Sequence, residues 1–498
     1  MNLFMLTASQ IASVLCGERI GGDPLSSVYA KVTASSSEVD EGSVFVAVRG
    51  HTADGHRFVD DAFARGASLA IVEDPAVLKG RAGIVVVNTR LALSRLASLV
   101  CGDPSSALKV VGITGTNGKT TTNWILYHLL NEIGGGALRI GTLGAECMGK
   151  GREEGTLTSP DPVSIQKLLQ SAVLAGAKSC VMETSSHALD QARVEDVQFD
   201  VGVFTNLTRD HLDYHKTFEH YFNAKRHLFE LLSVCVKETK GAVINSDDSY
   251  GASLVEEVGA LGLRDWSFGR SKMAMVRILE VHETPHHMRL SLQVKEFSKR
   301  YEIHAPFIGP HNAENVAAAF SSACALGLDA DVVSEALSRT PQVPGRLERV
   351  GEGGPRVFVD YAHTPDALER ALDAVRVSTE GELWCIFGCG GDRDKGKRPQ
   401  MATIAADHAD HVVVTSDNPR TEDPDAIIND ILACSITPTI VERDREKAIL
   451  QAIESADEKD TVVIAGKGHE DYQIIGATKI YFSDQEVAQR GLARRGPS

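Results

Sequence analysis

Along the chain, short runs of apolar residues alternate with segments in which apolar residues recur at helical spacing. This alternation predicts strands followed by helices. The segment 58–67 predicts a helix with Phe58, Ala62 and Ala67 on one side, and the segment 120–133 predicts a second helix. Apolar runs bounded by turn residues predict buried strands at 44–50, 83–88, 109–114, 179–184 and 201–206. Strands that alternate with helices are typical of a parallel, doubly wound sheet.

Two turn-rich segments, 101–106 and 340–346, divide this pattern into three regions. Between them, polar and apolar residues alternate over 275–304, which predicts a small antiparallel insertion. Beyond the second segment the rhythm resumes, with strands predicted at 356–362, 383–388, 411–417 and 462–468, and helices from Pro365, Arg398, Pro424 and Arg445. We therefore expect an α/β protein with domains at 1–105, 106–338 and 339–498.

Composition narrows the class of protein without changing this picture. The chain has 498 residues and a net charge of −16, which argues against nucleic acid or an anionic membrane surface as the main partner. No apolar run approaches the roughly 18–20 residues that span a bilayer, and no Lys or Arg precedes Arg19, so we expect a cytoplasmic protein without a membrane span. The nine cysteines form no CxxC pair and are expected to be reduced thiols, with Cys385 and Cys389 filling core space.

The segment from Gly112 to Thr121, GITGTNGKTT, carries the strongest chemical signal. It follows one predicted strand and opens a helix, where backbone N–H groups and the positive helix end bind phosphate. Lys119 is placed to reach terminal phosphates, and the Thr120 hydroxyl to bind Mg²⁺. The pattern departs from the standard phosphate loop because position 113, usually glycine, is Ile. The central region is thus expected to be a P-loop-type ATPase domain.

Acidic and imidazole side chains follow the next strands of the same region. Glu183 ends one predicted strand, and His211 lies shortly after another. The carboxyl ends of parallel strands meet at one edge of a sheet, so both side chains are candidates for one metal ion near the phosphate loop. Lys225, in an amphipathic helix, is by default predicted to be a solvated charge. Asn312 is usually a helix cap in such a position, and together with Asn315 it is also a candidate to bind the edge of a purine.

Polar clusters also end four consecutive strands of the C-terminal region. They lie at 360–365, 388–398, 417–420 and 466–470. The second cluster has Arg393 where a dinucleotide-binding loop has its third glycine, so its positive charges favour a different anionic ligand. This Rossmann-like third domain is expected to bind a ligand at that edge.

The motifs TGTNGKTTT, METSSHALDQARV, TNLTRDHLDYH, GPHNAENVAAA, VDYAHTPDALE, GCGGDRDKGKRP, DNPRTEDP and GKGHEDYQ together resemble the Mur ligase family over nearly the whole chain. Their order and spacing are most similar to the member that adds diaminopimelate. The resemblance implies an ATP-dependent, amide-forming ligase of cytoplasmic peptidoglycan precursor synthesis. Its expected small-molecule substrates are ATP, UDP-MurNAc-L-Ala-D-Glu and meso-diaminopimelate, and an acyl phosphate is the expected intermediate.

The resemblance also implies roles for single residues. Lys119, Glu183, His211 and Lys225 would be catalytic; Lys225, carbamylated by CO₂, would join Thr120, Glu183 and His211 around Mg²⁺. The ATP-binding residues would be Gly115, Thr116, Asn117, Gly118, Lys119, Thr120, Thr121, Asn312, Arg346 and Asp360. The UDP-MurNAc-dipeptide would be bound by Ser36, His51, Thr52, Ala53, Thr158, Ser159, Ser185, Gln191 and Arg193. Diaminopimelate would be bound by Arg393, Asp417, Asn418, Pro419, Arg420, Gly466 and Glu470.

Three alternatives stay open at this point. A ligase that adds L-lysine would not be expected to carry Arg420, whose fork suits the second carboxylate of diaminopimelate. A folylpolyglutamate synthase would share the phosphate loop but not the N-terminal region with Ser36 and His51. A nucleotide-dependent regulator would need no third domain with a charged edge. We expect a monomer.

Overall fold

The computed structural model describes residues 6–21, 31–50, 53–153, 157–284, 287–434 and 436–495. By contacts the chain divides into two compact units. One comprises Met1–Ile278, Leu292–Tyr301 and Glu314–Ala336, and the other comprises Leu279–Ser291, Glu302–Ala313 and Leu337–Ser498.

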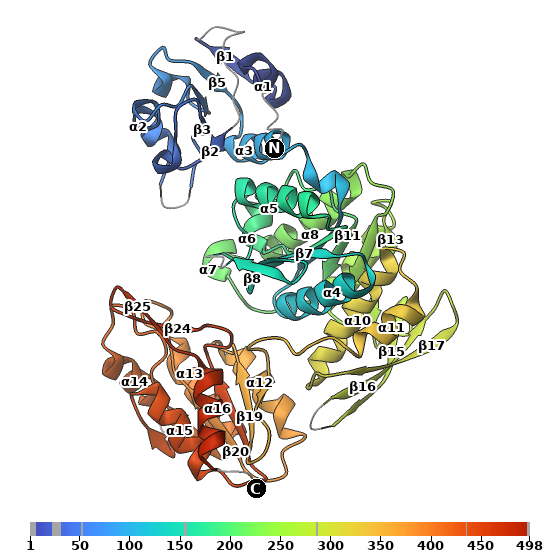
Figure 1. The fold of residues 1–498 in the computed structure, drawn as a ribbon, viewed down its shortest axis with the longest axis vertical. Coiled ribbons are helices and arrows are strands. Elements are labelled where there is room, and N and C mark those ends of the chain that lie inside the picture. Colours follow the sequence, from blue (N-terminus) through green and yellow to red (C-terminus); the bar gives the residue numbers. More distant parts are fainter. Residues whose placement is uncertain are drawn as a thin grey trace. The chain divides into compact units, whose positions relative to one another are not determined.

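The N-terminal region of the first unit is a small α/β fold, a five-stranded sheet with helices around it (Figure 1). Thr7 caps the first helix in a capping box with Gln10. Phe58, expected on the buried side of a helix, is instead 42% exposed, because it lies in a 3-10 turn, Gly55–Phe58, before α2 begins. In sheet order the strands are β1 (Glu18–Ile20), β5 (Gly83–Val85), β4 (Leu69–Val72), β3 (Val44–Val46) and β2 (Val32–Thr33); the helices are α1 (Ala8–Leu15), α2 (Val59–Ala64) and α3 (Thr89–Val100).

The central sheet of the first unit confirms the doubly wound prediction. Its strands run parallel from β13 to β7, and β8 and β9 extend it as an antiparallel edge that the sequence did not predict. In sheet order the strands are β13 (Arg264–Asp265), β12 (Gly241–Ile244), β11 (Val201–Phe204), β6 (Lys109–Thr114), β10 (Ser179–Glu183), β7 (Ala137–Gly141), β8 (Gly144–Cys147) and β9 (Lys150–Glu153).

Helices cover both faces of this central sheet. Val110, Cys180 and Ala242 face one cluster with side chains of α5 (Pro162–Ala175), α8 (Phe218–Val234) and α9 (Ser249–Val258). Figure 1 shows α4 (Lys119–Ile133) on the opposite side from α5. Short helices α6 (Ser186–Asp190) and α7 (Leu212–His215) follow β10 and β11, at the edge where the candidate residues lie.

A smaller sheet occupies the predicted insertion. Its order is β14-β15-β16-β17, with β14 (Phe268–Gly269), β15 (Val276–Glu283), β16 (Met288–Val294) and β17 (Lys299–Ala305). It leads into the apolar helix α10 (Pro310–Ala325) and then α11 (Ala330–Leu337). Every described helix is too short or too polar to cross a membrane.

The C-terminal sheet also has helices on both faces. Phe358, Cys385 and Cys389 belong to one apolar cluster, whereas Val357 and Trp384 belong to the cluster on the other face, as alternation along buried strands requires. In sheet order the strands are β18 (Glu348–Val350), β19 (Arg356–Asp360), β23 (Thr461–Ala465), β20 (Leu383–Phe387), β21 (His411–Val414) and β22 (Ile440–Val441). The helices are α12 (Pro365–Arg376), α13 (Lys397–His408), α14 (Pro424–Leu432), α15 (Arg445–Ser455) and α16 (Asp484–Arg494), and a hairpin joins β24 (Tyr472–Ile475) to β25 (Thr478–Tyr481).

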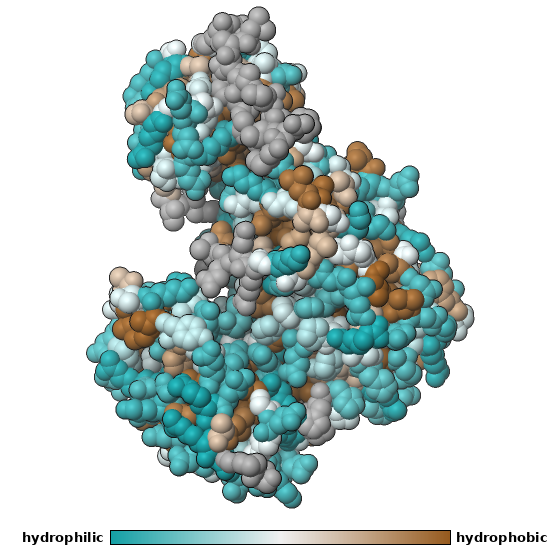
Figure 2. Space-filling model, in the orientation of Figure 1, coloured by the Kyte–Doolittle hydropathy of each residue, from teal (hydrophilic) through white to brown (hydrophobic). Residues whose placement is uncertain are grey.

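The strands β19, β23, β20 and β21 are adjacent and parallel. Their carboxyl ends therefore bring the four predicted polar clusters to one edge of the C-terminal sheet. On the face shown in Figure 2, apolar side chains lie in small groups between hydrophilic ones. This is the ordinary pattern of scattered exposed apolar residues and does not point to a docking surface there.

Candidate functional site

The loop between β6 and α4 has a backbone that requires glycine at two positions. Gly115 has φ +145°, and an added Cβ would lie 1.9 Å from Thr205 Oγ1. Gly118, the N-cap of α4, has φ +84°, and its Cβ would lie 2.3 Å from Asn315 Oδ1. The N–H group of Asn117 donates to Asn206 Oδ1 at 2.9 Å. The loop is thus held in one shape at the positive end of α4, as a phosphate cradle needs.

Two lysines meet at a single carbonyl of this loop. Lys119 Nζ donates to Gly115 O at 2.9 Å and to Thr116 O at 2.7 Å, and Lys225 Nζ donates to the same Gly115 O at 2.7 Å. Lys225 is 1% exposed. Burial lowers the pKa of Lys225 well below its usual range, and the neighbouring charge of Lys119 lowers this pKa further. The helical pattern alone predicts a solvated charge here, whereas Lys225 is a buried amine beside the phosphate loop.

Glu183 is fully buried at the end of β10 and faces the first turn of α4. Its carboxylate accepts from Thr120 Oγ1 at 3.1 Å, from Thr142 N at 2.8 Å and from Thr142 Oγ1 at 3.1 Å. Thr121 is also buried in that first turn. The hydroxyl of Thr120 and the carboxylate of Glu183 are hard oxygen donors, so this pair fits Mg²⁺.

His211 lies in a group of rings near the same loop. Its side chain is 48% exposed, and its ring is 4.8 Å from His187 and 6.3 Å from Tyr221, centroid to centroid. Tyr221 lies with its hydroxyl 3.2 Å from Thr116 Oγ1 and its ring 4.4 Å from Lys225 Nζ. Across the part of the chain that the structure describes, no three His, Cys, Asp or Glu side chains lie close enough to hold a metal ion by themselves.

Five residues expected to bind the UDP-linked dipeptide form one hydrogen-bonded network that extends to Glu183. Ser159 Oγ donates to Glu183 O at 2.8 Å and lies 3.3 Å from Ser185 Oγ. Arg193 donates to Ser159 O at 2.8 Å and to Gln191 Oε1 at 2.6 Å. The network closes through Thr158, whose hydroxyl lies 3.2 Å from that of Thr142.

The remaining residues of that predicted set lie in the N-terminal region. The hydroxyl of Ser36, with the guanidinium of Arg65, lowers the pKa of the Asp61 carboxyl. The carbonyl of Ala53 accepts from Gly50 N at 2.9 Å. His51 and Thr52 lie outside the described residues.

Residues expected to frame the nucleoside lie in the second unit. Asp360 is buried at the end of β19, where burial raises the pKa of its carboxyl, although Arg346 and two N–H groups oppose the rise. The Arg346 guanidinium lies 4.8 Å from the Tyr361 ring, and its buried Nε makes no hydrogen bond with any described residue. Asn312 is buried and donates to Ile308 O at 2.7 Å. Arg346 therefore has a donor available for a ligand.

Residues expected to bind diaminopimelate surround a lysine that the sequence analysis did not assign. Lys467 is fully buried, and its Nζ lies 3.6 Å from Asp417 Oδ1, 3.1 Å from Glu470 Oε2 and 3.4 Å from Asn418 Oδ1. Asn418 Nδ2 also donates to Glu470 Oε2 at 2.9 Å. Gly466 precedes Lys467, with φ +116°. Lys467 stands inside the GKGHE motif, and its position in that motif was the only signal in the sequence.

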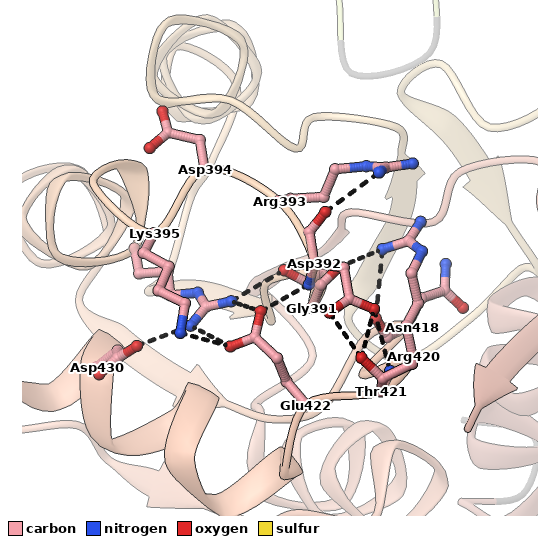
Figure 3. Close-up of polar contacts among 12 residues, drawn as sticks. Gly391, Asp392, Arg393, Asp394, Lys395, Asn418, Arg420, Thr421, Glu422 and Asp430 are labelled. Atoms are coloured by element: carbon pink, nitrogen blue, oxygen red, sulfur yellow. Dashed lines mark hydrogen bonds and ion pairs between the residues drawn. The ribbon is translucent and has the colours of Figure 1, made fainter. Parts of the chain in front are cut away.

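Arg393, Pro419 and Arg420 lie on the two neighbouring loops. Arg420 Nη1 donates to Gly391 O at 2.8 Å, and Arg393 Nη1 donates to Asp392 O at 3.2 Å. The carbonyl of Pro419 accepts from Glu422 N at 3.1 Å. Figure 3 shows both loops and these arginines. All seven residues predicted for this ligand thus lie along one edge of the C-terminal sheet.

Three family models match most of the chain. The Mur ligase family, catalytic domain, matches residues 28–100; the Mur ligase middle domain matches 113–323; and the Mur ligase, glutamate ligase domain, matches 345–468.

Curated relatives match over nearly their whole length. A UDP-N-acetylmuramoyl-L-alanyl-D-glutamate--2,6-diaminopimelate ligase of Thermosynechococcus vestitus is 45% identical over 93% of this chain and 92% of its own. The protein of the same name from Geobacter sulfurreducens is 43% identical over 91% and 92%.

A solved structure of a ligase of this name aligns with a TM-score of 0.73 and 29% identity, covering 99% of this chain and all of the other. A Mycobacterium tuberculosis folylpolyglutamate synthase, complexed with ADP and AMPPCP, aligns over 82% of this chain with a TM-score of 0.63 and 19% identity, which shows a shared fold alone. With family models across all three regions, and relatives above 40% identity over more than nine-tenths of its length, the chain belongs to the Mur ligase family.

Proposed function

We propose that this protein is an ATP-dependent ligase that joins meso-diaminopimelate to UDP-MurNAc-L-Ala-D-Glu through an amide bond. The observation that carries the proposal is its 45% and 43% identity, over more than nine-tenths of the chain, to curated ligases named for this reaction. The protein would act as a cytoplasmic monomer in peptidoglycan precursor synthesis, with ATP as its co-substrate.

The chemistry requires that a carboxylate become an electrophile. In the proposed reaction, the terminal carboxylate of the dipeptide attacks the γ-phosphorus of ATP, the bond to ADP breaks, and an acyl phosphate forms. The amine of diaminopimelate then attacks the acyl carbon, a proton leaves the nitrogen, and phosphate departs. The loop from Gly115 to Thr121 would hold the ATP phosphates, and Lys119 would neutralise the transferring group.

Thr120, Glu183 and His211 would hold Mg²⁺ near the loop, and the bond between Thr120 and Glu183 supports this placement. The ion would supply positive charge that stabilises the phosphates. Glu183 is held by Thr142 through two hydrogen bonds, so its carboxylate is oriented before any ligand binds.

Lys225 would complete this site as a carbamate. Its lowered pKa favours the neutral amine, which adds to CO₂: the Nζ–carbon bond forms, and one amine proton passes to water. The product is an anion with two oxygen atoms that can bind a metal ion, and it replaces the charged form of Lys225, which burial disfavours. Asn312, Arg346 and Asp360 would frame the nucleoside.

The dipeptide substrate would lie along the network that joins Ser159 and Arg193 to Glu183, with Ser36, His51, Thr52 and Ala53 at its UDP end. The bonds of Ser159 to Glu183 and of Arg193 to Ser159 support this proposal, because the carboxylate that receives the phosphoryl group must lie beside the phosphate loop. Arg393, Arg420 and the group around Lys467 would bind diaminopimelate. The buried Asp417 carboxylate, whose Oδ1 lies 3.6 Å from Lys467 Nζ, adds to the charged groups along this edge.

The test is phosphate release by the purified protein with Mg-ATP and UDP-MurNAc-L-Ala-D-Glu, with meso-diaminopimelate or L-lysine added in separate reactions. We expect turnover with diaminopimelate and not with lysine, and a product with the mass of the UDP-MurNAc-linked tripeptide. Turnover with lysine and not with diaminopimelate would leave the proposed mechanism in place and show that the acceptor amino acid is lysine. Turnover with neither, in protein shown to bind ATP, would reject the proposal and favour a folylpolyglutamate synthase-like ligase or a nucleotide-dependent regulator.

A further inference from the structure

Two loops of the C-terminal sheet, 388–396 after β20 and 415–423 after β21, are in direct backbone contact. Gly391 N donates to Asn418 O at 2.9 Å. A Cβ on Gly391 would lie 1.9 Å from Pro419 O, so only glycine fits at this approach. The two loops therefore behave as one structural piece.

Two carboxylates fasten the loops reciprocally (Figure 3). Asp392 of the first loop accepts from Thr421 N at 3.1 Å and from Thr421 Oγ1 at 2.8 Å. Glu422 of the second loop accepts from Asp392 N at 2.6 Å. Asp392 has φ +54°, a left-handed conformation that aspartate and asparagine tolerate better than most residues.

Arg398, at the start of α13, holds Glu422 in place. Its side chain is fully buried and donates to Glu422 at 2.9 and 3.1 Å, and to Asp430 at 2.7 Å. Lys395 Nζ lies 3.1 Å from the Glu422 carboxylate. Arg398, with the N–H of Asp392 and the Lys395 ammonium, lowers the pKa of Glu422 to about 2, so this carboxylate stays ionised at neutral pH.

Arg420 lies directly before the fastened residues. Its backbone has φ +52°, its N–H donates to Ile474 O at 3.0 Å, and its Nη1 donates to Gly391 O at 2.8 Å. An arginine in this conformation needs neighbours that over-determine it. Its guanidinium is held through one nitrogen by the first loop, and its backbone is held through Thr421 and Glu422.

We propose that Asp392, Thr421, Glu422 and Arg398 form a loop clamp that positions Arg420, and that this clamp sets selectivity for an acceptor amino acid with a distal carboxylate. The proposal rests on the proposed function, and it assigns these four residues a positioning role. A guanidinium binds a carboxylate through two parallel N–H groups in one plane. Small errors in the position of that plane weaken binding of the dicarboxylic acceptor while leaving lysine, which lacks the second carboxylate, unaffected.

The test uses the whole protein with substitutions that alter the clamp without touching Arg420. Thr421→Val removes the hydrogen bond from the Thr421 hydroxyl to Asp392 at nearly constant side-chain volume, whereas Thr421→Ser retains a hydroxyl that can make this bond. Glu422→Gln weakens the contact with Arg398. Thr403→Val is the matched control, because Thr403 lies on an exposed face of α13 and its hydroxyl donates within its own helix, to Pro399 O at 3.1 Å.

We expect Thr421→Val and Glu422→Gln to raise the diaminopimelate KM about tenfold, with kcat and the KM values of ATP and the UDP-dipeptide within twofold of wild type. Lysine should give no turnover in either variant, and Arg420→Lys should raise the diaminopimelate KM likewise, because a point charge cannot replace the guanidinium fork. Thr421→Ser and Thr403→Val should retain the wild-type values. This split separates positioning from a general structural role, which would lower thermal stability and affect all three substrates together.

The outcomes distinguish this proposal from the proposed function. Wild-type protein inactive with diaminopimelate would reject the proposed function itself. Active wild-type protein, with a diaminopimelate KM unchanged in both clamp variants, would overturn the loop clamp. An equal loss for every substrate in Thr421→Val, or no recovery in Thr421→Ser, would also overturn it. If Glu422→Gln does not fold, the Thr421 pair decides the question.

Discussion

Lys225 carries the sharpest prediction at the scale of one residue. Because its folded-state pKa is lowered, the unfolded chain binds the proton more readily, so this lysine lowers stability increasingly as pH falls from about 10.5 towards the folded-state pKa. In buffer free of bicarbonate, Lys225→Met should therefore unfold at a higher temperature than wild type, with the largest difference at the lower pH values. The same variant should lose activity by about 10²–10³-fold.

Calorimetry between pH 7 and pH 10 measures the stability difference. ¹³C NMR of protein equilibrated with ¹³C-bicarbonate tests the carbamate directly, since wild type should show a carbamate carbon that Lys225→Met lacks. A variant as active as wild type, or a wild-type spectrum without that signal, would remove Lys225 from the proposed metal site.

Gly118 gives a second prediction at this scale. Gly118→Ala should cost about 1–2 kcal/mol for its left-handed backbone and more for the collision with Asn315. Gly176→Ala is the control, because its φ of +90° is similar and no atom lies within 4 Å of the added Cβ. Thermal unfolding should rank Gly118→Ala below Gly176→Ala, and calorimetric titration with a non-hydrolysable ATP analogue should show weaker binding in Gly118→Ala alone. Equal behaviour of the two variants would show that the Asn315 contact does not shape the loop.

Local residue patterns could predict the phosphate loop but not the state of Lys225. The glycines and the Lys-Thr pair lie between a predicted strand and a predicted helix, and this local order is enough to predict an anion site. Burial of Lys225 depends on the loop that follows β6, 110 residues earlier in the chain, where the Gly115 carbonyl accepts from its Nζ. The same holds for Lys467, which follows β23 but has Asp417 and Asn418, after the separate strand β21, as partners.

At the scale of elements, one buried ion pair joins two helix N-termini to the ligand-binding edge of the C-terminal sheet. Arg445, which begins α15, donates to Asp484, which begins α16, at 2.7 and 2.8 Å, and both side chains are fully buried. Arg445 also donates to Ala465 O at 3.0 Å and to Ser416 O at 3.3 Å. Arg445→Met should cost about 3–5 kcal/mol, because Asp484 would be left charged and unpaired.

Urea unfolding of Arg445→Met, Asp484→Leu and the double variant measures this coupling. The double variant should recover most of the loss, since it leaves no buried charge alone. Strictly additive losses would mean that the two side chains stabilise the helices independently.

Helix starts were predicted well, and sheet edges were not. The helices expected from Pro365, Arg398, Pro424 and Arg445 begin at these positions or one residue earlier, because caps such as Thr364 are local. By contrast, β8 and β9 join the central sheet as an antiparallel edge whose position depends on pairing with β7, which no local pattern encodes.

At the scale of the whole molecule, the C-terminal core is nearly self-contained. Its two apolar clusters draw on residues 347–492, with Ile308 as the one contribution from earlier in the chain among the buried members described. A fragment of residues 339–498 should therefore fold alone and unfold in one cooperative transition. A shorter fragment, residues 339–455, lacks β23, which pairs with both β19 and β20, and should not fold.

Every residue proposed for diaminopimelate lies inside the 339–498 fragment, so the isolated fragment should bind this amino acid without nucleotide. Ligand binding to the folded state raises stability by RT ln(1 + [L]/Kd), and a concentration one hundred times Kd adds about 2.7 kcal/mol. Circular dichroism melts with meso-diaminopimelate, L-lysine or neither measure this shift directly. A shift with diaminopimelate alone would place acceptor recognition in this region. A cooperative fragment that neither amino acid stabilises would mean that acceptor binding needs residues outside 339–498.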